Sequence, residues 1–135
     1  MKTNLKLILS LGAIALFTLT LAAFSLSQNP WSVPDKYKNM KNATGGKDSD
    51  GVGEELYAQH CKSCHGKEGF GDGTKAKELK TEMRDLSSKE VQSQTDGAIY
   101  YKAIIGRDEM PNFEKKIRDE EDRWMTVNYL RSLAE

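Results

Sequence analysis

Apolar residues are distributed in two different ways along this 135-residue chain. Residues 7–24 form an uncharged run rich in Leu, Ala, Ile and Phe, preceded by Lys2 and Lys6. The run is longer than the usual core of a signal peptide and just reaches the lower limit for a membrane-spanning helix. Residues 1–26 are therefore predicted to be a cleaved signal peptide or an N-terminal membrane anchor, with the lysines inside and the rest exported.

Beyond residue 50, apolar positions recur at helical spacing near both ends of the remaining chain. A first helix is predicted from Asp50, which is placed to cap it. Its inner face comprises Gly53, Leu56, Tyr57, His60 and Cys61. A last helix is predicted from Asp119 to about Ala134, because acidic residues fill its first turn. Its apolar positions are Trp124, Val127, Tyr129, Leu130 and Leu133.

Shorter helices are predicted between these two. Residues 87–90 resemble a capping box for a helix ending near Gln94. Thr95 can cap a further helix over residues 96–105, which Gly106 closes. No convincing strand is found, so the predicted fold is a small all-α domain over residues 51–135.

Residues 27–50 differ from the rest because they are polar and rich in turn-forming residues. Pro30, Pro34 and the pair Gly45-Gly46 disfavour regular structure. Two interpretations are open for this segment: a strap pinned to the domain by its few apolar residues, and a disordered spacer. Those apolar residues are Trp31, Val33, Tyr37 and Met40.

The stretch HCKSCHG, residues 60–66, holds both cysteines and both histidines of the chain. The spacing Cys61-x-x-Cys64-His65 is typical of covalent haem attachment, in which two thiols bond the porphyrin and the next residue is the axial histidine. Such attachment takes place outside the bacterial cytoplasm, which agrees with the predicted export. The sequence therefore predicts one covalent haem c.

Two other chemistries use paired cysteines. A structural zinc site needs a second, separated pair of ligands, and the chain has only these two cysteines and two histidines. A thioredoxin-like dithiol site requires a βαβ pattern around the motif, and none is found. Both alternatives are disfavoured.

Composition restricts the possible classes of function further. All 20 Asp and Glu lie beyond residue 27, as do all Lys and Arg except Lys2 and Lys6, so that part of the chain has a net charge of −2. This balance argues against nucleic-acid binding, which requires a basic face. Only about 31% of those residues are apolar, which is sparse for a globular core. A haem with side chains packed on both faces would add the missing apolar surface.

A methionine is the expected second axial ligand. Met125 lies in a helix that must pack, Met40 lies in the predicted strap, and Met83 follows His65 by only 18 residues. Met110 follows a glycine-terminated helix and precedes Pro111, which stiffens its loop. Met110 is therefore predicted to ligate the iron opposite His65.

These motifs resemble the class I c-type cytochromes, which are bacterial monohaem electron carriers. The resemblance covers residues 53–133 and rests on Gly53 and Tyr57, Cys61 to Gly66, Gly69 to Gly73, Gly106 with Met110 to Phe113, and Tyr129 to Leu133. It implies first and last helices that cross, with Gly53 and Tyr57 meeting the face that carries Tyr129. It also implies a proline after Gly73, whose carbonyl orients the axial imidazole; Thr74 stands there, and its carbonyl can make the same bond.

The expected function is transfer of single electrons between extracytoplasmic redox partners, a donor and an acceptor, on the periplasmic side of the membrane. The protein is then not an enzyme by itself, although it can be a subunit of an oxidoreductase complex. The alternative is a haem enzyme or a gas or redox sensor in which Met110 is displaced from the iron. The sequence indicates neither the partners nor an oligomeric state.

Overall fold

The computed structural model describes residues 31–48 and 50–134, so the predicted signal peptide or anchor over residues 7–24 lies outside the described residues. Within the described ranges there is no β-strand, only an isolated bridge between Arg107 and Met110. The all-α prediction is confirmed. No described helix is both long enough and apolar enough to cross a membrane.

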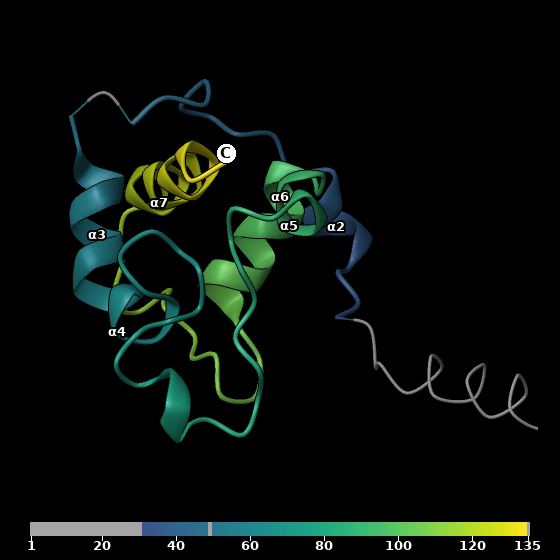
Figure 1. Cartoon of the computed structure of the whole chain (residues 1–135). Helices are drawn as coiled ribbons and strands as arrows, with labels where there is room; N and C mark the ends of the chain where they lie inside the picture. The colour runs from purple at the N-terminus through teal and green to yellow at the C-terminus, as the bar shows by residue number, and fades with distance from the viewer. Residues whose placement is uncertain (1–30, 49, 135) are drawn as a thin grey trace, which may run out of the picture. The chain divides into compact units, whose positions relative to one another are not determined.

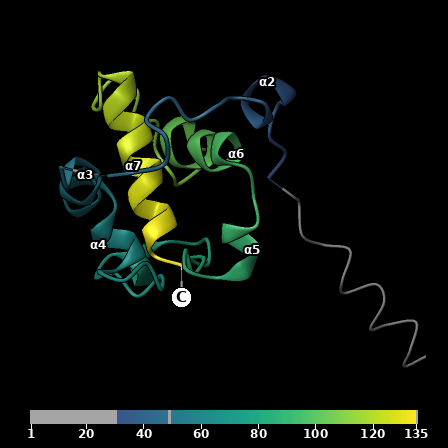
Figure 2. The ribbon, with the colours of Figure 1, turned by 90° about the horizontal axis from the view of Figure 1, so that it is seen from above.

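Short helices surround one longer helix, α7. Figures 1 and 2 show α7 with α3 and α4 on one side and α5 and α6 on the other, and α2 next to α6. The elements are α2 (Asp35–Lys38), α3 (Val52–His60), α4 (Lys62–His65), the 3₁₀ turn η1 (Ala76–Glu78), α5 (Lys89–Gln92), α6 (Asp96–Tyr100), the π-helical segment η2 (Tyr101–Ile105) and α7 (Glu120–Ser132).

Helices α3 and α7 cross in direct backbone contact. A Cβ atom on Gly53 would overlap the carbonyl oxygen of Met125, so only glycine fits at this point of α3. One turn further on, the rings of Tyr57 and Tyr129 pack with their centroids 5.1 Å apart. The crossing implied by the resemblance is thus present, with Gly53 and Tyr57 against the face that carries Tyr129.

The start of α3 differs from its prediction. Gly51, in the left-handed region with φ 72°, is the N-cap residue and makes no side-chain cap. The carboxylate of Asp48 instead accepts hydrogen bonds from Gly53 N (2.9 Å) and Glu54 N (3.1 Å). The turn at Gly51 therefore makes Asp48, and not Asp50, the capping residue, which supplies acceptors for two amides at the positive end of the helix.

The middle helices are present with altered ends. Ser88 Oγ accepts from Val91 N at the start of α5, so the cap is a single bond and not the predicted capping box, and α5 ends at Gln92. Thr95 caps α6 as predicted. The chain then continues as η2, because Gly106 N donates to Tyr101 O, five residues back. The predicted helix over residues 96–105 is thus an α-helix followed by one π turn.

The last helix, α7, is confirmed with Asp119 as its cap, which accepts from Glu121 N at 2.8 Å. Its inner face carries two of the most deeply buried side chains of the domain, Trp124 and Val127. Trp124 packs against Tyr100 of α6 with ring centroids 4.6 Å apart. The core cluster comprises Tyr57, Cys61, Ile99, Tyr100, Ile104, Phe113, Ile117, Trp124, Val127 and Leu130.

Residues 33–48 form a strap that packs on the helical domain, which favours the first of the two interpretations of this polar segment. Val33 is buried, and Tyr37 stacks on Tyr101 with a centroid separation of 4.6 Å. Asn128 of α7 fastens the other end, since its Oδ1 accepts from Asn42 and its Nδ2 donates to the Thr44 hydroxyl (2.7 Å). The strap thus adds buried contacts to a domain whose sequence is poor in apolar residues.

The C-terminal half of α7 is tied to the α5–α6 connection by a charged side chain. Arg131 donates to Asp96 Oδ1 from two nitrogens, at 2.8 and 2.7 Å, and to the carbonyl oxygens of Gln92 and Gln94. A guanidinium group supplies several donors in a fixed plane, which suits a site that joins one carboxylate and two carbonyls. This contact holds α5 and α6 against α7.

Replacing Gly53 with Ala tests the helix crossing. Alanine favours a helix intrinsically by about 1 kcal/mol, but here its Cβ would push α3 away from α7. We expect the free energy of unfolding, measured by urea titration of the haem-loaded protein, to fall by about 1–3 kcal/mol. Glu55→Ala, on the exposed face of α3, is the control and should change stability by less than about 0.5 kcal/mol. A more stable Gly53→Ala protein would contradict the described crossing.

Replacing Asn128 with Ala tests the strap. The side chain is 3% exposed and bonds three strap residues, so the change leaves buried groups without partners. The free energy of unfolding should drop by about 1–3 kcal/mol in the same urea experiment. Gln59→Ala removes an exposed amide from α3 and serves as the matched control. Equal stability of the two variants would mean that the strap is not held by α7.

Candidate haem-binding site

The two cysteines and His65 occupy a single tight turn at the end of α3. Cys61 closes α3, and α4 begins at the next residue. The amides of Cys64 and His65 both donate to the carbonyl oxygen of Cys61, at 3.1 and 3.0 Å. Both thiols are free, so no disulfide closes the turn. The chain therefore presents two thiols and an imidazole within one short helical segment.

The imidazole of His65 is buried but incompletely bonded. Its exposed fraction is 8%, and its Nδ1 atom has no hydrogen-bond partner in the described part of the chain. Burial lowers the pKa of His65, so the ring is neutral near pH 7 and retains a lone pair for a metal. A buried polar atom without a partner is costly in an ordinary core, so this nitrogen sets His65 apart from an ordinary core residue.

The predicted bond from His65 to the carbonyl of Thr74 is not made. The backbone of residues 73–75 is instead fixed to the cysteine turn: Gly73 N donates to Cys64 O at 3.2 Å, and Lys75 N donates to Ser63 O at 2.8 Å. In this arrangement no carbonyl of the loop accepts a hydrogen bond from Nδ1.

The chemistry of the thiols argues against the alternatives. Burial, with a smaller contribution from Cys64, raises the pKa of Cys61 to about 12. A redox-active dithiol acts as a thiolate, which requires the opposite shift. In addition, residues 31–48 and 50–134 contain no group of three or more Cys, His, Asp or Glu side chains that could hold a metal ion.

The residues that follow His65 fold back on the turn and brace it. The hydroxyl of Tyr57 donates to Gly66 O at 2.7 Å inside the protein, and its pKa is raised chiefly by burial. Gly71 N donates to His65 O at 2.8 Å. Because Tyr57 also packs on α7, the backbone next to His65 is fixed directly to the crossing helices.

Met110 lies in a second loop, between η2 and α7. Its amide donates to Arg107 O at 2.8 Å, and beyond it Phe113 N donates to Ile104 O at 2.8 Å. Gly106, with φ 70°, begins the loop; a Cβ there would overlap the carbonyl oxygen of Met110. The loop is therefore a tightly closed turn. Met110 is partly buried against the core cluster to which Cys61 also belongs.

The other methionines of the described residues contact the helices, the core or the glycine loop. Met125 sits on α7, where its carbonyl adjoins Gly53 and its sulfur is 3.8 Å from Asn128 Nδ2. Met40 packs from the strap against the core cluster. Met83 adjoins the glycine loop, with its Cβ 2.9 Å from the position that a Cβ on Gly71 would take. His60, at the end of α3, lies near Phe113 with a ring separation of 5.7 Å.

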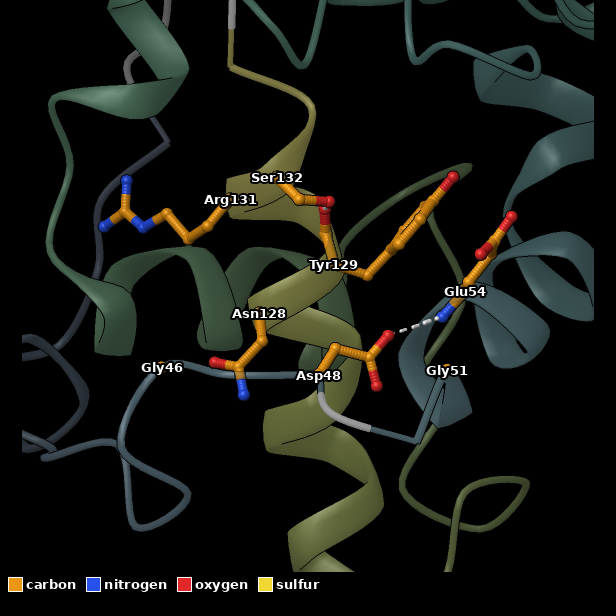
Figure 3. Close-up of a pocket in the computed structure, with 8 residues that line it drawn as sticks. All are labelled: Gly46, Asp48, Gly51, Glu54, Asn128, Tyr129, Arg131 and Ser132. Atoms are coloured by element: carbon orange, nitrogen blue, oxygen red, sulfur yellow. Dashed lines mark hydrogen bonds between the residues drawn. The ribbon is translucent and has the colours of Figure 1, made fainter.

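A pocket of about 470 Å³ lies elsewhere, between the strap, the start of α3 and the end of α7 (Figure 3). Three of its polar side chains are used in structural bonds: Asp48 caps α3, Asn128 holds the strap, and Arg131 binds the α5–α6 connection. Cys61, Cys64 and His65 do not line it. This pocket lies where the strap, α3 and α7 meet, and it is not part of the site formed by the cysteine turn.

The comparisons with known proteins agree with this geometry. The family model described as cytochrome C oxidase, cbb3-type, subunit III matches residues 49–130, well over half of the chain. The chain belongs to this family. No curated protein matches it. As a cytochrome c domain it carries covalently bound haem c and transfers electrons, as a carrier or an oxidase subunit and not as an enzyme on its own.

The residues of the cysteine turn fit the haem that this family carries. Two unpaired thiols are available for thioether bonds, and the neutral, buried imidazole of His65 follows the second thiol directly. Lys62 within the turn and Lys67 just after it are exposed, while Cys61 belongs to the hydrophobic core cluster. The turn thus offers two attachment points and one nitrogen that could hold a flat apolar cofactor.

Sequence reasoning missed two residues that hold the backbone around the site. Asp48 orients α3, and Glu109 bonds the backbone of residues 80 and 81. Only Asp48 left a signal, as an acidic residue shortly before a helix. The contacts of Glu109 span 28 or 29 residues, and no local pattern marks them.

Replacing the cysteines tests the attachment. Cys61→Ser and Cys64→Ser should each lose one thioether bond, and the double variant should release its haem into acidified organic solvent, whereas the unaltered protein retains it. Intact mass spectrometry of the exported protein should show the added mass of one haem. Ser63→Ala, between the two cysteines, is the control and should keep both bonds. Haem that is extractable from the unaltered protein would contradict this attachment.

Proposed function

We propose that this protein is a monohaem class I c-type cytochrome that carries single electrons between extracytoplasmic redox partners. In this proposal Cys61 and Cys64 hold the haem, and His65 and Met110 are the two axial ligands. The observation that carries it is the buried, neutral imidazole of His65, whose Nδ1 has no partner and which directly follows the thiol pair.

The loop of Met110 supports its assignment as the second ligand. A thioether is a weak ligand, so it binds well only if the chain holds it in place beforehand. The closed turn at Arg107 and the crowded glycine at position 106 fix the backbone around Met110. The other three methionines of the described domain pack in the strap, in α7 and against the glycine loop.

Ligands on both faces determine the chemistry. When bound, the haem supplies a one-electron couple without an open position for substrate, so electrons pass to docked proteins and no bonds are made. A soft thioether favours ferrous iron and raises the reduction potential. The unbonded Nδ1 of His65 acts in the same direction, since a second-shell acceptor would make the imidazole a stronger donor. A positive potential is therefore proposed.

The family and the predicted leader support the proposed partners and location. The family description names an oxidase subunit, which supports a place in or beside a terminal oxidase, with one redox protein as donor and another as acceptor. Residues 7–24 would export the domain, and, if uncleaved, would tether it to the inner membrane on the periplasmic side.

Replacing Met110 tests the ligation. Met110→Ala should lower the midpoint potential by on the order of 100 mV or more and abolish the absorption band that thioether-to-ferric-iron charge transfer gives. The reduced variant should bind carbon monoxide rapidly, while the unaltered protein binds it slowly. Met125→Leu is the matched control and should keep the potential and the band.

Two results would contradict the proposal. A clearly negative midpoint potential in the unaltered protein would exclude ligation by His65 and Met110. Rapid, complete binding of carbon monoxide to the unaltered reduced protein would favour the gas sensor or haem enzyme, in which Met110 leaves the iron.

A further inference from the structure

Glu109, the residue before Met110, makes the longest-range hydrogen bonds of its loop. Its carboxylate accepts from Lys80 N through both oxygens, at 3.0 and 3.1 Å, and from Thr81 N at 2.8 Å. The two amides belong to a segment 28 or 29 residues earlier in the chain. One exposed side chain thus connects two loops that lie far apart in the sequence.

The segment that Glu109 holds is itself fixed to the cysteine turn. Residues 66–86 leave the turn after His65 and are fastened to it by the bond from Lys75 N to Ser63 O. Further along, Leu86 N donates to Gly69 O at 2.8 Å, which closes the segment on itself. Glu109 therefore connects the loop of Met110 to the part of the chain that braces His65.

The loop of Met110 has a specific need for such a connection. Arg107 and Pro111 to Asn112 are exposed, and Asp108 is a non-glycine residue in the left-handed region, with φ 53°. Two further hydrogen bonds of the loop are local, from Met110 N to Arg107 O and from Glu114 N to Asn112 Oδ1. Local bonds fix the shape of a turn but not its position relative to a distant segment.

We propose that Glu109 is a positioning residue that fastens the Met110 loop to residues 80–81 and so keeps the thioether on the iron. This inference rests on the proposed ligation by Met110. Glu109 touches neither the haem nor the reacting atoms in this account; it acts through the backbone that it holds. Because the bonds are exposed, they contribute little to the free energy of unfolding. Their main effect is on how often the loop opens.

The test measures ligand exchange in the complete, haem-loaded protein. Exogenous imidazole is added to the oxidised protein, and the loss of the thioether charge-transfer band is followed over time. Glu109→Ala removes the acceptors and should increase the exchange rate about two- to fivefold, the range expected for exposed charged contacts. Glu109→Gln keeps one oxygen that can accept from Thr81 N and should give an intermediate rate.

Glu82→Ala is the matched control. Glu82 is exposed and lies next to residues 80–81, so its replacement removes one negative charge beside these residues and leaves the Glu109 bonds in place. Its exchange rate should equal that of the unaltered protein. Urea unfolding midpoints should be the same for all three variants, which separates an effect on the loop from a general loss of stability.

The outcomes separate this inference from the proposed function. An unchanged exchange rate in Glu109→Ala overturns the positioning role while leaving ligation by Met110 intact. Equal acceleration in Glu109→Ala, Glu109→Gln and Glu82→Ala overturns it too, because that pattern reports charge and not a specific bond. Retention of the charge-transfer band in Met110→Ala would instead refute the ligation itself, whatever the Glu109 variants do.

Discussion

The contact between the backbone of Gly53 and the carbonyl of Met125 is the constraint on which the rest of this domain depends. It lets α3 and α7 cross without intervening side chains, and α3 runs directly into Cys61. On its other side, α7 packs on α6 through the Trp124–Tyr100 pair. The segment η2, which continues α6, leads into the loop of Met110. A single crossing thereby fixes the starting points of both segments that carry the proposed iron ligands.

The site consists of irregular backbone supported from outside by regular elements. Tyr57 connects the crossing helices to Gly66, and the carbonyls of the cysteine turn bind the loop that follows. Because the core is small, each such bond contributes substantially to holding the cysteine turn in place. Proposed ligands held in this way are preorganised by their surroundings, which is what a site must achieve when its function requires little rearrangement.

The parts of this fold that sequence predicts are those with local causes. Helix α7 follows from Asp119 as a cap and from apolar spacing around Trp124, and the cysteine turn follows from its motif. The errors have long-range or conformational causes. Asp48 replaces Asp50 as the cap because of the left-handed turn at Gly51, and Nδ1 of His65 is left unbonded because residues 73–75 are tied to Ser63 and Cys64. Neither cause is visible in residue spacing.

The π turn of η2 has a consequence for how this chain can vary in length. Its widened ring, closed between Gly106 N and Tyr101 O, accommodates one residue more than a regular turn. Deleting a single residue here would remove that extra residue and restore an ordinary helical turn, with the flanking residues close to their present faces. A deletion within the regular helix α7 would instead rotate everything beyond it by about 100° around the axis. The π turn is therefore a point at which this helical segment can lose one residue while Ile104 stays in the interior.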